Sequence, residues 1–275
     1  MPRYTRTTRR TRRPRIVRKR RTTRKAPLTK MVRRVAAQQV LRMSETKRIA
    51  LLNETWSLTP TTPSGSQYSI ANIFSVVQQN QNATGGGMVG DTILRPLFVA
   101  KMRALVNWDR VRQLNGGGTG STSVTLHAWI VASNDQLVLG TPASVNPYDA
   151  GSSGPQWFYN TDAFSATLNG DNVKVLKHWS RTIHPPSIVS GTGSTALATV
   201  TAIRHKFVLK FKGQKEFEGR IPSTTQPGAL QPWLKGWNYY LLIGGGTPTG
   251  YPLTGSPLAP LWDIYVDRYL YFKDF

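Results

Sequence analysis

The first 44 residues carry positive charge with no acid to balance it. Of the chain's 36 Lys and Arg residues, 17 precede Glu45, which is the first acid in the sequence. The run from Arg9 to Arg15 sets its charges side by side around Pro14 and leaves no apolar face. Such a run repels itself and stays extended until an anion neutralises it. The sequence therefore predicts a largely disordered basic arm over residues 1–44 and a separate folded domain over residues 45–275.

The arm is predicted to bind nucleic acid. Arg outnumbers Lys in it, and the guanidinium fork makes bidentate contacts with phosphate. An anionic membrane surface, a solubility tail and a mitochondrial transit peptide are the alternatives, although a transit peptide requires an amphipathic helix from the start. The run 18–21 also matches a nuclear import signal. The candidate nucleic-acid-binding residues are Arg3, Arg6, Arg9, Arg10, Arg12, Arg13, Arg15, Arg18, Lys19, Arg20, Arg21, Arg24, Lys25, Arg33 and Arg34.

One helix is predicted between the arm and the domain. From Leu28 to Met43, apolar residues recur at helical spacing while Arg33, Arg34 and Arg42 take other positions. We interpret this segment as a short basic helix that links the two parts. The alternative is an ordinary helix whose apolar side packs against the domain.

The domain is predicted to be all-β. Nineteen basic and thirteen acidic residues follow Ser44, so its net charge is only about +6 of the total +23. Gly and Pro clusters separate segments that alternate or are rich in β-branched and aromatic residues. No helical pattern lies between these segments, which favours an antiparallel sandwich or jelly roll over a βαβ fold. The strands are expected over residues 48–58, 93–107, 124–132, 174–183, 204–212, 239–243 and 264–272, with long loops over 135–172 and 213–237.

Alternation also predicts which side chains face the core. In residues 204–212, His205, Phe207, Leu209 and Phe211 point one way and the basic residues point the other. In residues 124–132, alternate apolar residues predict a strand buried on one face. Trp233, Trp237, Tyr239 and Tyr240 are expected in the core or a subunit contact, with stacking on unpaired bases as the alternative.

The sequence carries no pattern that indicates an enzyme. There is no cysteine, and the four histidines, His127, His178, His184 and His205, lie on separate segments without metal-ligand spacing. Residues 85–90 match the dinucleotide fingerprint in letters, but no strand precedes them and no helix follows. We therefore expect no catalytic residue, no cofactor and no metal. Neither a secretory signal nor a membrane-spanning segment is expected.

Three motifs support a resemblance to a known family. They are the Arg-rich residues 9–21, the turn Val89-Gly90-Asp91-Thr92-Ile93 that continues to Lys101-Met102-Arg103, and the aromatic end Arg268-Tyr269-Leu270-Tyr271-Phe272-Lys273-Asp274. With them, the chain resembles the capsid proteins of small circular, Rep-encoding single-stranded DNA viruses, the circovirus-like group. The resemblance covers nearly the whole chain as an arrangement of arm, linker and β domain.

The resemblance implies a single eight-stranded jelly roll that assembles with itself into an icosahedral shell of about sixty copies. It also implies arms directed onto single-stranded DNA, entry into the host nucleus through the arm, and residence in the virion. Sixty arms would neutralise on the order of a thousand phosphates, the scale of a small genome. Shell-side candidates are Arg103, Lys206, Lys210 and Lys212, whose alternative role is a merely solvated sheet face.

Other functions remain open at this level. The same layout suits a capsid protein of a small RNA virus, because arm chemistry does not distinguish DNA from RNA. It also suits a non-viral structural protein, such as a chromatin or ribosomal factor. An enzyme with a basic targeting arm would instead need convergent polar side chains in a pocket.

Overall fold

The computed structural model describes residues 28–43, 46–58, 67–77, 91–108, 111, 123–134, 143–144, 157–159, 165–185, 200–222, 230–247 and 262–273. The chain divides into two compact units, Met1–Met43 and Ser44–Phe275. The helix and the β domain are therefore described separately. The predicted disorder of the arm falls on residues 1–27 and lies outside the described residues.

The predicted basic helix is confirmed. Helix α1 spans Leu28–Met43, and its first turn carries no acid. Arg33 and Arg34 are exposed, and the apolar side chains of Met31, Val32 and Val35 are 64%, 59% and 54% exposed. The helix thus presents both basic and apolar side chains to solvent.

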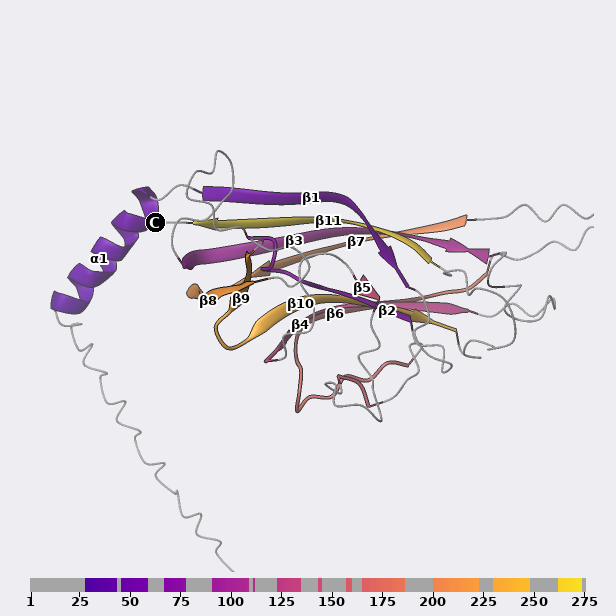
Figure 1. The fold of residues 1–275 in the computed structure, drawn as a ribbon. Helices are drawn as coiled ribbons and strands as arrows, with labels where there is room; N and C mark the ends of the chain where they lie inside the picture. Colours follow the sequence, from indigo (N-terminus) through magenta and orange to yellow (C-terminus); the bar gives the residue numbers. More distant parts are fainter. Residues whose placement is uncertain are drawn as a thin grey trace, which may run out of the picture. The chain divides into compact units, whose positions relative to one another are not determined.

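The β domain consists of two antiparallel sheets, which confirms the predicted all-β class. Figure 1 shows the sheets stacked face to face as two layers. The first sheet has the order β1 (Thr46–Ser57), β11 (Trp262–Lys273), β3 (Thr92–Asn107), β8 (Gln214–Pro222) and β9 (Leu230–Leu234), and β7 (Val200–Lys210) also pairs with β3. The second sheet has the order β5 (Ala143–Ser144), β2 (Gln67–Asn72), β10 (Asn238–Gly246), β4 (Val124–Ser133) and β6 (Lys174–Ile183).

All seven strands predicted by residue range are present, but the described residues contain eleven strands rather than eight. The additional strands are β2, β5, β8 and β9. The loop predicted over residues 213–237 is wrong, because β8 and β9 lie within it and pair with each other. Strand β8 follows β7 after a bend at Gly213, whose φ of 74° suits glycine, and pairs with β3 only at Thr92–Leu94. Neither the charge-rich β8 nor the short β9 shows clear alternation of apolar and polar residues, so their pairing in the folded domain determines that they form strands.

The main core lies between the two sheets. On β11, Ile264, Val266, Leu270 and Phe272 are buried, as the alternation of apolar residues in 264–272 predicts, and Trp262, just before that range, is buried as well. Residues 204–212 also alternate as predicted, since Phe207 and Phe211 are buried and His205 and Leu209 are partly buried, while Arg204, Lys206 and Lys210 are exposed. Strand period alone therefore located this core face correctly.

Strand β4 departs from the prediction of one buried face, because all ten of its residues are buried. Its second face packs in another apolar cluster that includes Trp157 and Phe158. The Phe158 ring lies 4.5 Å from Tyr68 and 5.7 Å from Trp129, centroid to centroid. A segment distant in sequence thus covers this face, and the strand's own pattern did not indicate it.

A substitution at Gly244 on β10 tests the packing of this cluster. A Cβ placed there would lie 2.5 Å from the Tyr68 ring, and Tyr68 is fully buried. We expect Gly244→Ala to lower the free energy of unfolding by about 1–3 kcal/mol, measured by urea unfolding. Gly170→Ala is the control, because no atom lies within 4 Å of its Cβ. Equal stability of the two variants would contradict this packing.

Candidate nucleic-acid interface

Most predicted nucleic-acid contacts lie outside the described residues. These are Arg3, Arg6, Arg9, Arg10, Arg12, Arg13, Arg15, Arg18, Lys19, Arg20, Arg21, Arg24 and Lys25, including the run 18–21 of the predicted import signal. Arg33 and Arg34 are described, and both are exposed on α1. The β domain carries a second basic surface, on one side of its first sheet.

This second surface is the outer side of the first sheet, here named the basic face. It comprises Arg48 on β1, Lys101 and Arg103 on β3, and Arg204, Lys206 and Lys210 on β7, all of them exposed. The alternation that buries Phe98, Ala100, Met102 and Ala104 turns the intervening residues of β3 outward. The basic residues on three strands therefore share one side of the sheet.

The register of the strands places two pairs of cations opposite each other. Lys101 pairs with Lys206 and Arg103 pairs with Arg204 across the β3–β7 ladder. On the other flank of β3, Asp267 lies opposite Lys101 and Tyr265 lies opposite Arg103. The Arg103 guanidinium carbon lies 4.9 Å from the Tyr265 ring centroid, and Lys101 Nζ lies 5.2 Å from that of Tyr269. Cations and aromatic rings are thus interleaved here.

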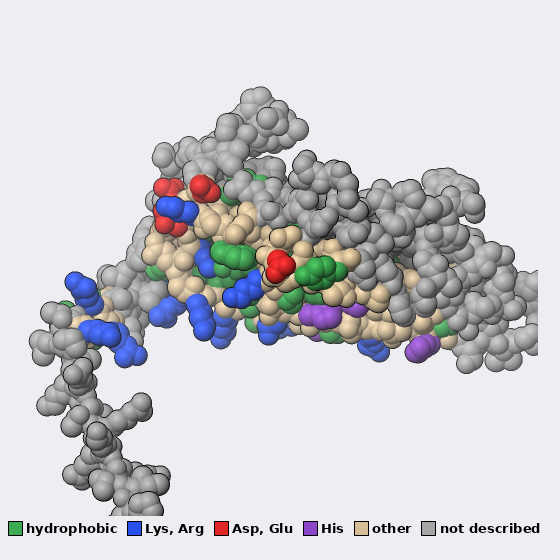
Figure 2. All heavy atoms as spheres, turned by 90° about the horizontal axis from the view of Figure 1, so that it is seen from below, with side chains coloured by type: hydrophobic (Ala, Val, Ile, Leu, Met, Phe, Trp, Pro, Cys, Tyr) green, Lys and Arg blue, Asp and Glu red, His purple; other side chains and the backbone are tan. Residues whose placement is uncertain are grey.

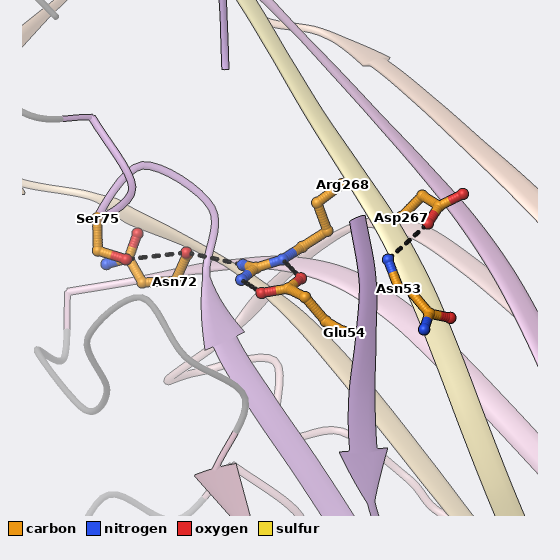
Figure 3. Close-up of polar contacts among 6 residues, drawn as sticks. All are labelled: Asn53, Glu54, Asn72, Ser75, Asp267 and Arg268. Carbon is orange, nitrogen blue, oxygen red and sulfur yellow. Dashed lines mark hydrogen bonds and ion pairs between the residues drawn. The ribbon is translucent and has the colours of Figure 1, made fainter. Parts of the chain in front are cut away.

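Several of these residues line an open pocket of about 570 Å³. Its lining includes Lys101, Arg103, Arg204, Lys206 and Tyr265, with Asn53 and Asp267. Asn53 has a positive φ of 53° at the irregularity in β1 pairing, and its backbone N–H donates to Asp267 Oδ1 at 2.8 Å (Figure 3). The Asp267 carboxylate, the one carboxylate among the described lining residues, therefore already accepts a hydrogen bond from a backbone donor.

Arg268, on the next position of β11, is directed into the core instead. It is 3% exposed, and its Nε and Nη2 donate to the Glu54 carboxylate at 2.5 and 2.6 Å. Nη1 donates to the Asn72 carbonyl at 3.4 Å (Figure 3). The guanidinium joins β1 and β11 of one sheet to the end of β2 in the other. Its role is structural, although it belongs to the basic, aromatic C-terminal motif.

Two of the four histidines, on β4 and β6, lie closer together than their separation in sequence suggested. His127 Nδ1 and His178 Nε2 are 3.3 Å apart in a hydrogen bond, and the His205 ring stacks on Trp179 at 4.5 Å. Partial burial lowers the pKa of His178 and of His205 below the ordinary value of 6.5. These two rings are therefore mainly neutral at pH 7, and the positive charge of the basic face comes from its Lys and Arg side chains.

Basic side chains also follow one margin of the β domain in the view from the second sheet. Figure 2 shows Lys and Arg along that margin with histidine side chains beside them, while acidic side chains lie away from it. Among the described residues, no three His, Cys, Asp or Glu side chains form a group that could hold a metal ion. Within the same ranges, no helix has the length and apolar character needed to span a membrane.

The structure brings together three of the four shell-side candidates. Arg103, Lys206 and Lys210 lie on the basic face, and Lys212, just beyond β7, is exposed. Sequence reasoning did not single out Lys101, Arg204 or Tyr265 as partners in one site. Alternation could have placed Lys101 beside Arg103, but only the β3–β7 pairing brings Arg204 opposite to it.

Comparison of the chain with protein-family models gives no match, and comparison with characterised proteins gives none either.

Proposed function

We propose that this chain is a viral capsid protein that assembles into a small icosahedral shell and packages single-stranded DNA through its basic arm. The observation that carries the proposal is that one chain contains two basic elements. One is an arm with 17 Lys and Arg residues and no acid, and the other is a sheet face with like-charged rows. Both elements suit a polyanion bound through phosphate rather than through bases.

The strand topology supports a jelly roll as the shell-forming unit. Following the chain, β1, β3, β7 and β11 enter the first sheet, and β2, β4, β6 and β10 enter the second. The first and last strands, β1 and β11, are neighbours along their length. An eight-stranded roll with two Greek keys has this kind of crossing, and β5, β8 and β9 would be short additions to it. Jelly rolls occur in capsids and also in unrelated proteins, so the fold alone does not carry the function.

The resemblance to circovirus-like capsid proteins adds the genome type and the location. We propose DNA over RNA, a virion protein that passes through the host nucleus, and an import signal at Arg18, Lys19, Arg20 and Arg21. The chain is proposed to act as an assembly protein and not as an enzyme. Its proposed partners are copies of itself and single-stranded nucleic acid.

Electron microscopy of the purified full-length chain tests assembly. At moderate salt, with single-stranded DNA, we expect closed particles of uniform size, and nucleic acid that co-purifies should be digested by DNase after the particles are opened. Protein that stays monomeric with and without single-stranded DNA would exclude the capsid proposal and favour a non-viral nucleic-acid-binding protein. Co-purifying RNA would favour an RNA virus.

We also expect affinity for oligonucleotides to fall steeply with salt, because phosphate contacts release counterions, and to depend little on base sequence.

A further inference from the structure

We propose that Lys101, Arg103, Arg204 and Lys206, with the Tyr265 ring, form a binding site for the phosphate backbone of unpaired nucleic acid. The inference rests on the proposed function, and it assigns to the wall of the particle a defined contact separate from the arm. Its residues line the pocket of about 570 Å³ on the outer side of the first sheet.

Without a ligand, the arrangement of these four cations is unfavourable. Like charges directly opposite each other on neighbouring strands destabilise a sheet. Here two such pairs are consecutive on the same face, Lys101 with Lys206 and Arg103 with Arg204. The four side chains start from positions about 5 Å apart across the strands and about 7 Å apart along them. An anion between them would replace this repulsion with attraction.

The described residues neutralise little of that positive charge. Among the described residues of the pocket lining, Asp267 is the one acid, and it lies opposite Lys101 while accepting the Asn53 N–H. Within the described ranges, no ion pair joins Arg204 or Lys206 to a carboxylate. Four cations against one carboxylate leave the pocket strongly positive. Two guanidinium groups among them provide bidentate donors for phosphate oxygens.

The aromatic rings beside these cations favour unpaired nucleic acid as the ligand. Tyr265 and Tyr269 are half-buried on the same face, and the cations of Arg103 and Lys101 lie over their rings. Aromatic rings within a basic groove bind single strands, because a base that is not paired can stack on them. A sulfated polysaccharide would use the cations but has no base to stack. The aromatic rings therefore favour a nucleotide chain.

Photo-crosslinking of the full-length protein to oligo(dT) tests the site. Ultraviolet crosslinking followed by mass spectrometry should find Tyr265 among the crosslinked residues. The double substitution Arg103→Gln with Arg204→Gln should reduce the yield at Tyr265 about tenfold, since two of the four phosphate donors are removed. The matched control is Lys174→Gln with Lys177→Gln on β6, which removes the same charge where Ala132 and Ile130 lie opposite. We expect the control to change the yield less than about twofold.

A stability measurement on nucleic-acid-free protein supplies an independent readout. Lys206→Gln should raise the melting temperature by about 1–3 °C, because it removes one like-charged pair. Lys177→Gln should leave the melting temperature within about 1 °C, since it lies opposite an apolar residue. A higher melting temperature together with a lower crosslinking yield would show that these cations favour binding at the expense of stability.

Three results would overturn the inference. They are an unchanged Tyr265 yield in the double variant, a lower melting temperature for Lys206→Gln than for the control, and displacement of oligo(dT) from Tyr265 by heparin but not by unlabelled oligo(dT). Particles that assemble without a Tyr265 crosslink would reject the pocket and leave the capsid proposal intact. Protein that crosslinks at Tyr265 but never assembles would reject the capsid proposal and leave the pocket intact.

Discussion

A chain that lacks residues 1–25 is expected to retain a folded β domain and to lose most of its affinity for nucleic acid. The deletion removes 13 of the 17 basic residues that precede Glu45. Ser44–Phe275 forms a compact unit of its own, with its apolar core between the two sheets. The deleted segment contains only three large apolar or aromatic residues after Met1, so little buried area depends on it.

Titration of a fluorescent oligonucleotide at several salt concentrations measures this effect. Each lost phosphate contact should reduce the slope of log affinity against log salt by about 0.7 for a single strand. A full-length variant with the 13 basic residues changed to Gln separates the loss of charge from the loss of chain length. We expect that variant to bind as weakly as the deletion. An unfolded deletion product, judged by circular dichroism, would refute the division into arm and domain.

The second large effect is expected at the buried ion pair. Arg268→Met should lower the free energy of unfolding by about 3–5 kcal/mol, because it leaves the Glu54 carboxylate next to the core without its partner. The Glu54 side chain is 16% exposed, so water can reach it and we expect a value near the lower end. The Asn72 carbonyl, which also accepts from Arg268, would lose a donor.

Urea unfolding of a double-substitution set distinguishes the buried ion pair from simple loss of packing. The variant Arg268→Met with Glu54→Leu should recover at least half of the lost stability, since it removes both charges together. Arg181→Met on β6 is the control, because that side chain is exposed, and its effect should stay within about 0.5 kcal/mol. If the double variant is as unstable as Arg268→Met alone, the Glu54 charge is not the cause.

Strong local patterns accounted for much of the fold. The helix at Leu28–Met43 and the strand at Lys174–Ile183 match their predicted ranges, and β7 and β11 bury the residues that alternation selected. Prediction failed where neighbours in space decide the outcome. All of β4 is buried because residues 157 and 158 belong to a cluster on its second face. Strands β8 and β9 exist through pairing with each other.

The candidate site divides in the same way. Its composition could be read from the sequence, because Arg103, Lys206 and Lys210 fall on polar positions of alternating segments. The positions of these residues relative to one another could not be read from the sequence. Lys101 and Arg103 are about a hundred residues from Arg204 and Lys206 in the chain, and only antiparallel pairing of β3 with β7 sets them opposite each other. The same applies to Arg268, which reads as one more basic residue until Glu54 and Asn72 are seen around it.

The sequence by itself determined that a basic arm precedes an all-β domain. Charge density and side-chain period are local properties, and a window of about ten neighbouring residues is enough to measure either of them. The tertiary structure decided which charged side chains face solvent and which hold the fold together. Arg204 faces solvent beside another cation, whereas Arg268 faces a carboxylate in the core. Strand register decides between these two environments, and register is set by contacts between segments far apart in the chain.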